Sequence, residues 1–164
     1  MLVLGRTFPI SRPWPKAGGL SWDDASLVPM SNANREGIFQ RTKEALQLLA
    51  CSPAVQFRLL PSFVCVGDEL ALDFNHWQGV MTDNFSSELT PEQIASLAVI
   101  DETFSRFSKL GSEYSEDFWT DEAVRKSLAW ENIRQMARRA LSLFGWPEEE
   151  PPSHAHEFVK GSAS

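Results

Sequence analysis

Apolar residues recur at helical spacing in three separate stretches of the chain. Between residues 34 and 50 the stripe consists of Phe39, Thr42, Leu46 and Leu49, with Ile38 and Ala45 beside it. Because an α-helix turns once every 3.6 residues, this spacing gathers the side chains on one face and predicts an amphipathic helix. Ser52 and Pro53 end that helix, and Pro53 to Leu60 predicts a short second helix that Pro61 closes.

The other two stretches carry clear start and stop signals. Thr90 predicts an N-cap, with Pro91 in the first helical position and Gln93 completing a capping box. The stripe that follows consists of Ile94, Leu97, Asp101, Phe104 and Leu110, and Gly111 predicts its end. Another helix is expected to start at Thr120, and a break near Ser127 precedes a long C-terminal helix. Its core-facing residues are Trp130, Ile133, Ala137, Ala140, Leu141 and Phe144, and Gly145-Trp146-Pro147 ends it.

Residues 62–81 fit more than one structure. Residues 62–66 favour a short extended segment before Gly67. Over residues 68–81, alternation of Leu70, Leu72 and Phe74 suits a strand, whereas the spacing of Leu70, Phe74, Trp77 and Met81 suits a helix. The helical pattern covers more of the segment and has Asp68 available at its start. We therefore predict a helix over residues 68–81.

Together these elements predict a mainly α fold, a single-domain bundle of four to six helices with a loop-rich N-terminal arm and the option of short strands. The arm covers residues 1–33, where four prolines and Gly18-Gly19 disfavour regular structure, although residues 2–8 suit an edge strand. We expect Trp14 and Trp22 to dock on the helical body. The helical core domain is expected at 34–147 and a solvated acidic tail at 148–164.

The length of 164 residues suits one domain, and the net charge of −7 narrows the function. A nucleic-acid partner is not expected, because phosphate binding needs clustered Lys and Arg. The chain has no stretch of 18 apolar residues and no signal-peptide pattern, so we expect a cytoplasmic protein with no membrane partner. Cys51 and Cys65 form no metal-ligand motif, which favours free buried thiols, with a disulfide as the alternative.

The acids and bases are separated along the sequence. No Lys or Arg occurs between Arg58 and Arg106, and that stretch contains eight acids: Asp68, Glu69, Asp73, Asp83, Glu88, Glu92, Asp101 and Glu102. The bases gather elsewhere, notably in Arg125, Lys126, Arg134, Arg138 and Arg139. Like charges that lie together repel one another, so a surface of clustered acids lowers the stability of the fold. A function in binding a basic partner would explain why the acids are clustered.

One constellation suits catalysis or metal binding. Glu69, Asp73 and His76 lie at i, i+4 and i+7 of the predicted helix, a spacing that puts two carboxylates and an imidazole on one face. A further ligand or acid–base partner is lacking, since the other two histidines, His154 and His156, both lie in the tail. A solvent-facing surface is therefore the simpler interpretation of the three residues.

Other chemical signatures are missing or have a structural explanation. The sequence contains neither a glycine-rich phosphate loop nor the elbow motif of a serine nucleophile. Arg134, Arg138 and Arg139 favour a solvated helix face that pairs with Glu131 and neighbouring acids. No cofactor is expected.

The favoured hypothesis is a non-catalytic binding protein that neutralises a basic protein partner, in particular an immunity (antitoxin-type) protein that blocks a bacterial toxin domain. Nuclease toxins are basic because their substrate is polyanionic, so an acidic inhibitor can occupy the same field. The residues expected to meet the partner are Asp68, Glu69, Asp73, Asp83 and Glu88. The alternatives are a small metal-dependent enzyme that uses Glu69, Asp73 and His76, and a helical adaptor or assembly subunit that pairs through its C-terminal helix.

Overall fold

The computed structural model describes residues 31–153, and within that range it contains six α-helices, two 3-10 turns and no strand. The elements are α1 (Asn32–Ala50), α2 (Pro53–Leu59), α3 (Val66–Phe85), η1 (Ser86–Glu88), α4 (Pro91–Phe107), η2 (Glu116–Trp119), α5 (Asp121–Lys126) and α6 (Leu128–Phe144). The prediction of a mainly α bundle of four to six helices is confirmed. The expected edge strand at residues 2–8, together with Trp14, Trp22, His154 and His156, lies outside the described residues.

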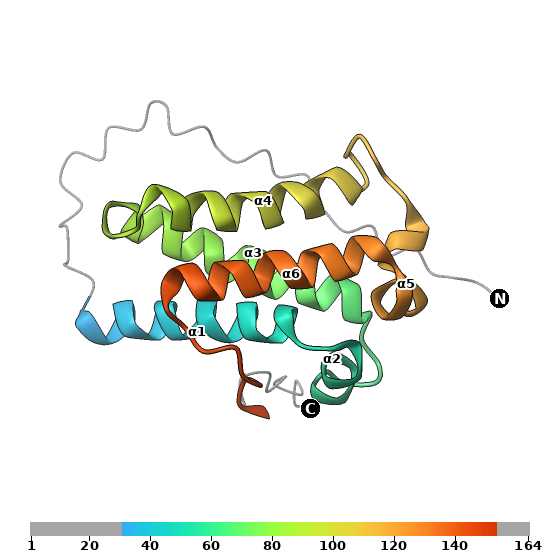
Figure 1. The fold of residues 1–164 in the computed structure, drawn as a ribbon, viewed down its shortest axis with the longest axis horizontal. Helices are drawn as coiled ribbons and strands as arrows, with labels where there is room; N and C mark the ends of the chain where they lie inside the picture. The colour runs from blue at the N-terminus through green and yellow to red at the C-terminus, as the bar shows by residue number, and fades with distance from the viewer. Residues whose placement is uncertain (1–30, 154–164) are drawn as a thin grey trace, which may run out of the picture.

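The four long helices form a bundle in which each runs opposite to the next along the chain (Figure 1). α1 packs on α3 and α6, and α4 packs on α6 and, less extensively, on α3. The short helices α2 and α5 lie at one end of the bundle, where α3 and α6 begin and α4 ends (Figure 1). We call this the α5 end. In the described part of the chain, no helix combines the length and the apolar character that crossing a membrane requires.

Side-chain caps begin three of the four long helices, α1, α4 and α6, and a left-handed glycine ends α6. The Thr90 hydroxyl accepts a hydrogen bond from the Gln93 amide at 3.2 Å, and the Gln93 side chain accepts one from the Thr90 amide at 2.9 Å, so the predicted capping box is confirmed. Ser31 caps α1, which therefore begins two residues before its expected start. Gly145 ends α6 in the left-handed region at φ 67°, as predicted.

The stretch at 68–81 is helical, as the longer of the two patterns predicted, and lies inside α3. Leu70, Phe74 and Met81 are buried, whereas Leu72 is 40% exposed. A strand would have placed Leu72 on the same face as Leu70, so the burial pattern distinguishes the two alternatives. The predicted break at Ser127 is also confirmed, since this residue ends α5 and caps α6.

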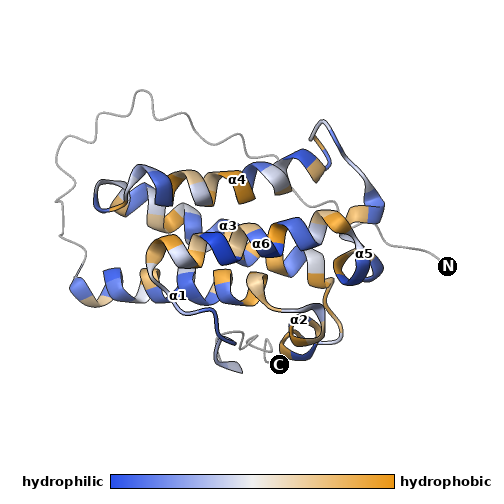
Figure 2. Cartoon of the chain, in the orientation of Figure 1, coloured by the Kyte–Doolittle hydropathy of each residue, from blue (hydrophilic) through white to orange (hydrophobic). Residues whose placement is uncertain are grey.

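The core is centred on aromatic side chains between α4, η2 and α6. Trp130 is fully buried, and its indole nitrogen donates to the Phe118 carbonyl at 2.7 Å. Its ring lies 5.1 Å from that of Phe118 and 5.7 Å from that of Phe104. Phe107 stacks on Phe118 at 4.1 Å, which joins the end of α4 to η2. Each long helix carries both hydrophobic and hydrophilic residues along its length, as expected of amphipathic helices in a bundle (Figure 2).

Two local predictions are wrong. Residues 62–64 form a turn rather than an extended segment, because the Val64 amide donates to the Pro61 carbonyl at 3.3 Å and α3 begins directly afterwards. α4 ends at Phe107, before Gly111, and Leu110 is 77% exposed instead of contributing to the core. The reason lies at Ser108, whose amide and hydroxyl both donate to the Ser105 carbonyl and so close the helix one turn early.

A third prediction fails at Arg134, which was expected in a solvated face and is only 2% exposed. Its guanidinium donates to the Val124 carbonyl, and at 3.3 Å to the side chains of Gln56 and Glu131. Gln56 in turn donates to two carbonyls in the last turn of α1, each at 3.1 Å. A buried polar network thus satisfies the end of α1 and ties it to α2, α5 and α6. The predicted pairing with Glu131 is confirmed for Arg134 and for Arg138, at 3.3 and 3.4 Å.

Candidate protein-binding surface

Three of the predicted site residues lie together at the beginning of α3. Asp68 and Glu69 occupy its first turn, and Asp73 follows one turn after Glu69 on the same side of the helix. Partial burial raises the pKa of Glu69, and the charges of Asp68 and Asp73 raise it further. Burial also raises the pKa of Asp68. The carboxylates are thus close enough to repel one another, and their ionised forms are less favourable here than in water.

The other two predicted residues lie elsewhere. Asp83 is exposed near the far end of α3, about 22 Å along the helix axis from Asp68 at 1.5 Å per residue. The Glu88 carboxylate, in η1, pairs with the guanidinium of Arg35 on α1 at 2.5 Å. Arg35 also lies over the Phe39 ring at 4.4 Å. Glu88 is therefore neutralised within the chain, and it does not join the carboxylates at the start of α3.

α4 adds a second acidic pair. Asp101 is partly buried, and its pKa is raised by that burial and then by the charge of Glu102. α3 contains no Lys or Arg, and the first base on α4 is Arg106 in its last turn. Arg106 already pairs with Glu113 at 3.4 Å. Over most of their length, the outer sides of α3 and α4 therefore carry acids that no base on the same helices offsets.

Sequence reasoning missed further acids at the α5 end. Glu116 and Asp117 form the start of η2, and Asp121 and Glu122 form the first turn of α5. The charges of Asp68 and Asp121 both raise the pKa of the Cys65 thiol, after the larger effect of burial, so the beginnings of α3 and α5 converge. The signal was present in the sequence, because no Lys or Arg occurs between Lys109 and Arg125. The acidic stretch predicted from the sequence ends at Glu102 and so leaves these residues out.

The proposed metal or acid–base constellation does not assemble. His76 is exposed, and its ring meets that of Trp77 edge-on at 4.7 Å. Within residues 31–153, no three His, Cys, Asp or Glu side chains are arranged to hold a metal ion, and that range includes Glu69, Asp73 and His76. Helical spacing put these residues on one side of α3, but a metal site needs side chains that converge on one point.

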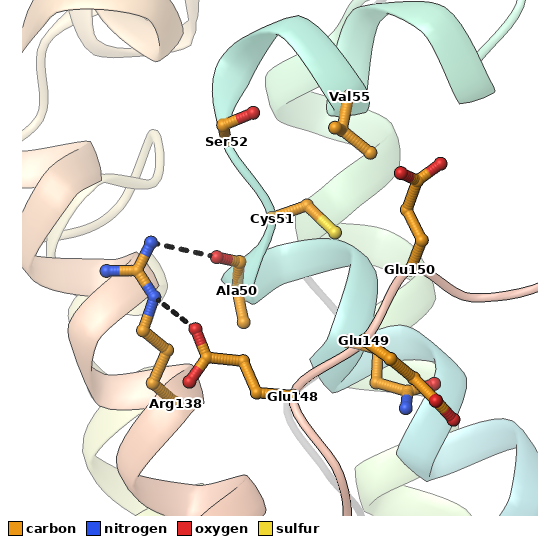
Figure 3. A pocket seen from close by; sticks show the side chains of 9 residues that line it. Ala50, Cys51, Ser52, Val55, Arg138, Glu148, Glu149 and Glu150 are labelled. Atoms are coloured by element: carbon orange, nitrogen blue, oxygen red, sulfur yellow. Dashed lines mark hydrogen bonds and ion pairs between the residues drawn. The ribbon is translucent and has the colours of Figure 1, made fainter.

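The segment after Pro147, expected to be solvated, makes specific contacts with the helical body (Figure 3). Glu148 pairs with Arg138 at 3.0 Å, Glu150 pairs with Arg58, and Pro151 is buried. The Arg138 guanidinium also donates to the carbonyl of Ala50 at 3.1 Å. Residues 147–151 thus lie across the junction of α1 and α2.

A shallow depression of about 220 Å³ lies beneath this segment and contains Cys51 (Figure 3). Its volume is below the roughly 300–1,000 Å³ of typical small-molecule sites. Burial, followed by the charge of Glu150, raises the pKa of the Cys51 thiol to about 11. A thiol with that pKa stays protonated at neutral pH and is a poor nucleophile. Cys51 and Cys65 are both free, as predicted, but the predicted burial is wrong, since Cys51 is half-buried and Cys65 is exposed.

No family model, curated protein sequence or solved structure matched the chain when it was compared with them. The function must therefore be inferred from the side chains themselves. Their most distinctive arrangement is the concentration of carboxylates on α3, α4, η2 and α5.

Proposed function

We propose that this chain is a non-catalytic binding protein of the cytoplasm whose acidic surface docks a basic protein, and that it acts as an immunity protein against a bacterial toxin. The observation that carries the proposal is the group formed by Asp68, Glu69 and Asp73 on a helix without Lys or Arg. Partial burial raises the pKa values of Asp68 and Glu69, and the charges of Asp68 and Asp73 raise that of Glu69 further. A basic partner would relieve the repulsion between these carboxylates. Binding would therefore remove an unfavourable electrostatic free energy that the free protein carries.

The rest of the described structure is compatible with a binding role. The depression over Cys51 is small, and its thiol is protonated at neutral pH. Arg106, at the end of α4, is engaged by Glu113. An opposed electrostatic field speeds the encounter of two proteins and favours the correct partner. An inhibitor that must reach its toxin quickly benefits from such a field.

The first test measures equilibrium binding by titration calorimetry. The titrant is the purified product of the reading frame adjacent to this chain's own, because immunity proteins are expected beside the toxins they block. The double variant Asp68→Asn/Glu69→Gln removes two charges from the start of α3. The matched control, Glu36→Gln/Glu149→Gln, removes the same charge from exposed positions on α1 and after α6.

We expect the first variant to bind the partner roughly tenfold more weakly and the control to bind as the parent does. Docking should also release protons at mildly acidic pH, because a basic partner lowers the raised pKa values of Asp68 and Glu69. Equal affinities for the parent and both variants, without proton release, would contradict the proposal.

A further inference from the structure

The α5 end of the bundle exposes an unusual share of apolar side chains. Of the seven large hydrophobic residues exposed among residues 31–153, four lie there: Phe63 at 75%, Leu110 at 77%, Tyr114 at 44% and Leu128 at 75%. They come from the α2–α3 turn, the α4–η2 loop and the first residue of α6, which all lie at this end of the bundle (Figure 1). Single exposed apolar residues are normal, but several at one end of a molecule mark an interaction surface.

The segments that carry these residues are held in place. The Cys65 thiol donates to the Trp119 carbonyl at 3.2 Å, and a side chain on Gly67 would meet the Trp130 ring at 3.1 Å. The Trp119 indole donates to the Phe107 carbonyl at 3.0 Å. The α2–α3 turn, the end of α4 and η2 are thereby fastened to one another.

Leu110 is presented by a tightly closed loop. The Gly111 amide donates to the Ser108 carbonyl at 2.8 Å, and the Glu113 amide donates to the Arg106 carbonyl at 3.0 Å. A Cβ at Gly111 would lie only 2.1 Å from that same Arg106 carbonyl oxygen, so the loop requires glycine. Leu110 therefore points outward in a defined geometry, and a partner that binds it has little loop entropy to remove.

The charges around these apolar residues are mainly negative. Five acids at this end have no ion pair within the described chain: Asp68, Glu69, Glu116, Asp117 and Asp121. The nearby bases are largely engaged. Lys126 pairs with Glu122 at 3.2 Å, and the Arg125 guanidinium lies 3.5 Å over the Phe57 ring. Lys109 and Arg125 are the two bases of this end without an ion pair in the described chain, and Arg125 is held against Phe57.

We infer that the partner of this chain docks on the α5 end, through a basic segment whose apolar side chains pack against Leu110, Leu128 and Phe63 while its Lys and Arg residues meet the surrounding carboxylates. The inference rests on the proposed function and locates its surface. An apolar centre with a charged rim is the usual anatomy of a protein interface. A second copy of this chain is a poor occupant, because it would bring carboxylates against carboxylates at a net charge of −7 per chain.

The test uses a synthetic peptide of Lys and Leu whose leucines fall on one face, with an all-Lys peptide and a Glu/Leu peptide as controls. Amide chemical shifts of the ¹⁵N-labelled full chain locate the binding site. We expect the Lys/Leu peptide to shift amides at residues 62–69, 108–117 and 120–128. The all-Lys peptide should bind more weakly because it lacks the apolar anchors, and the Glu/Leu peptide should not bind.

Variants then separate the apolar contribution from the electrostatic one. Leu110→Ser/Leu128→Ser should lower the affinity for the Lys/Leu peptide at least roughly tenfold. The melting temperature of the protein should not fall, since both side chains are exposed. The control, Val99→Ser/Leu143→Ser, changes exposed apolar residues outside the α5 end and should leave the affinity unchanged.

The inference is overturned if the Lys/Leu peptide fails to bind, or if the Leu110 and Leu128 variant leaves its binding unchanged. Shifts centred on Asp83 and Glu92 instead would also overturn it, while the proposed function would stand with its surface on the opposite end. The proposed function itself is decided separately, by the affinity of the natural partner for the Asp68/Glu69 variant.

Discussion

Replacing Phe104 with alanine removes a ring at which three others meet. Phe104 is 2% exposed, and its ring lies 5.7 Å from Trp130, 6.2 Å from Trp119 and 6.3 Å from Phe74. These partners come from α3, η2 and α6, so the surrounding side chains cannot collapse into the space without moving several elements. We therefore expect Phe104→Ala to cost about 3–5 kcal/mol of unfolding free energy, the upper part of the range for large-to-small changes.

Urea unfolding at 25 °C and thermal melting measure this cost. A loss of 1 kcal/mol shifts the melting temperature of a chain of this size by about 2–4 °C, so a decrease of about 6–20 °C is expected. Leu128→Ala is the matched control, because Leu128 is 75% exposed and its truncation should cost little. Equal stability of Phe104→Ala and Leu128→Ala would refute the assignment of the core.

Three further predictions concern polar groups. Arg134→Met removes the donor to the buried Val124 carbonyl, and we expect a loss of about 1–3 kcal/mol in urea unfolding, whereas a parent-like midpoint would show that the network contributes nothing. Truncation after Pro147 removes two partly exposed ion pairs and the buried Pro151 but no part of the helical core, so the fold should persist with a loss of about 1 kcal/mol per ion pair or less; unfolding of the truncated chain would contradict this. Burial raises the pKa of Asp101, so its contribution to stability is present below about pH 4 and is lost as pH rises through the folded-state pKa. Asp101→Asn should therefore lose less stability than the parent between mildly acidic and neutral pH, and identical pH profiles would exclude this origin.

Local signals in the sequence predicted most of the fold because they act over a few residues. Thr90 and Gln93 form their capping box, and Gly145 ends α6, without help from distant elements. Leu110 was misplaced for a different reason. Leu110 fits the apolar periodicity of α4, but the helix ends before it because the Ser108 amide and hydroxyl donate to the Ser105 carbonyl. The spacing of apolar residues cannot predict such a local hydrogen bond.

The site was less predictable, since it depends on which segments meet. The sequence predicts Arg134 as a surface residue. In the fold its buried guanidinium donates to the side chain of Gln56, which is 78 residues away along the chain. Glu88 was predicted to meet the partner, but in the fold it forms an ion pair with Arg35. Conversely, Asp121 lies far from Asp68 in sequence, yet the charges of both residues raise the pKa of the Cys65 thiol. Charge segregation along the chain motivates the proposal of a basic partner, whereas tertiary contacts determine which acids are available to one.

Stopped-flow measurement of the association rate with the adjacent reading frame's product, at low and moderate salt, is the decisive experiment. If an acidic surface steers a basic partner, the parent's rate should fall as salt rises, because screening shortens the reach of the field. The variant with Asp68, Glu69, Asp73 and Asp83 replaced by Asn or Gln should associate more slowly at low salt and depend less on salt. Rates for the parent and this variant that coincide at both salt concentrations would show that the carboxylates do not steer a partner, and would contradict the proposed function.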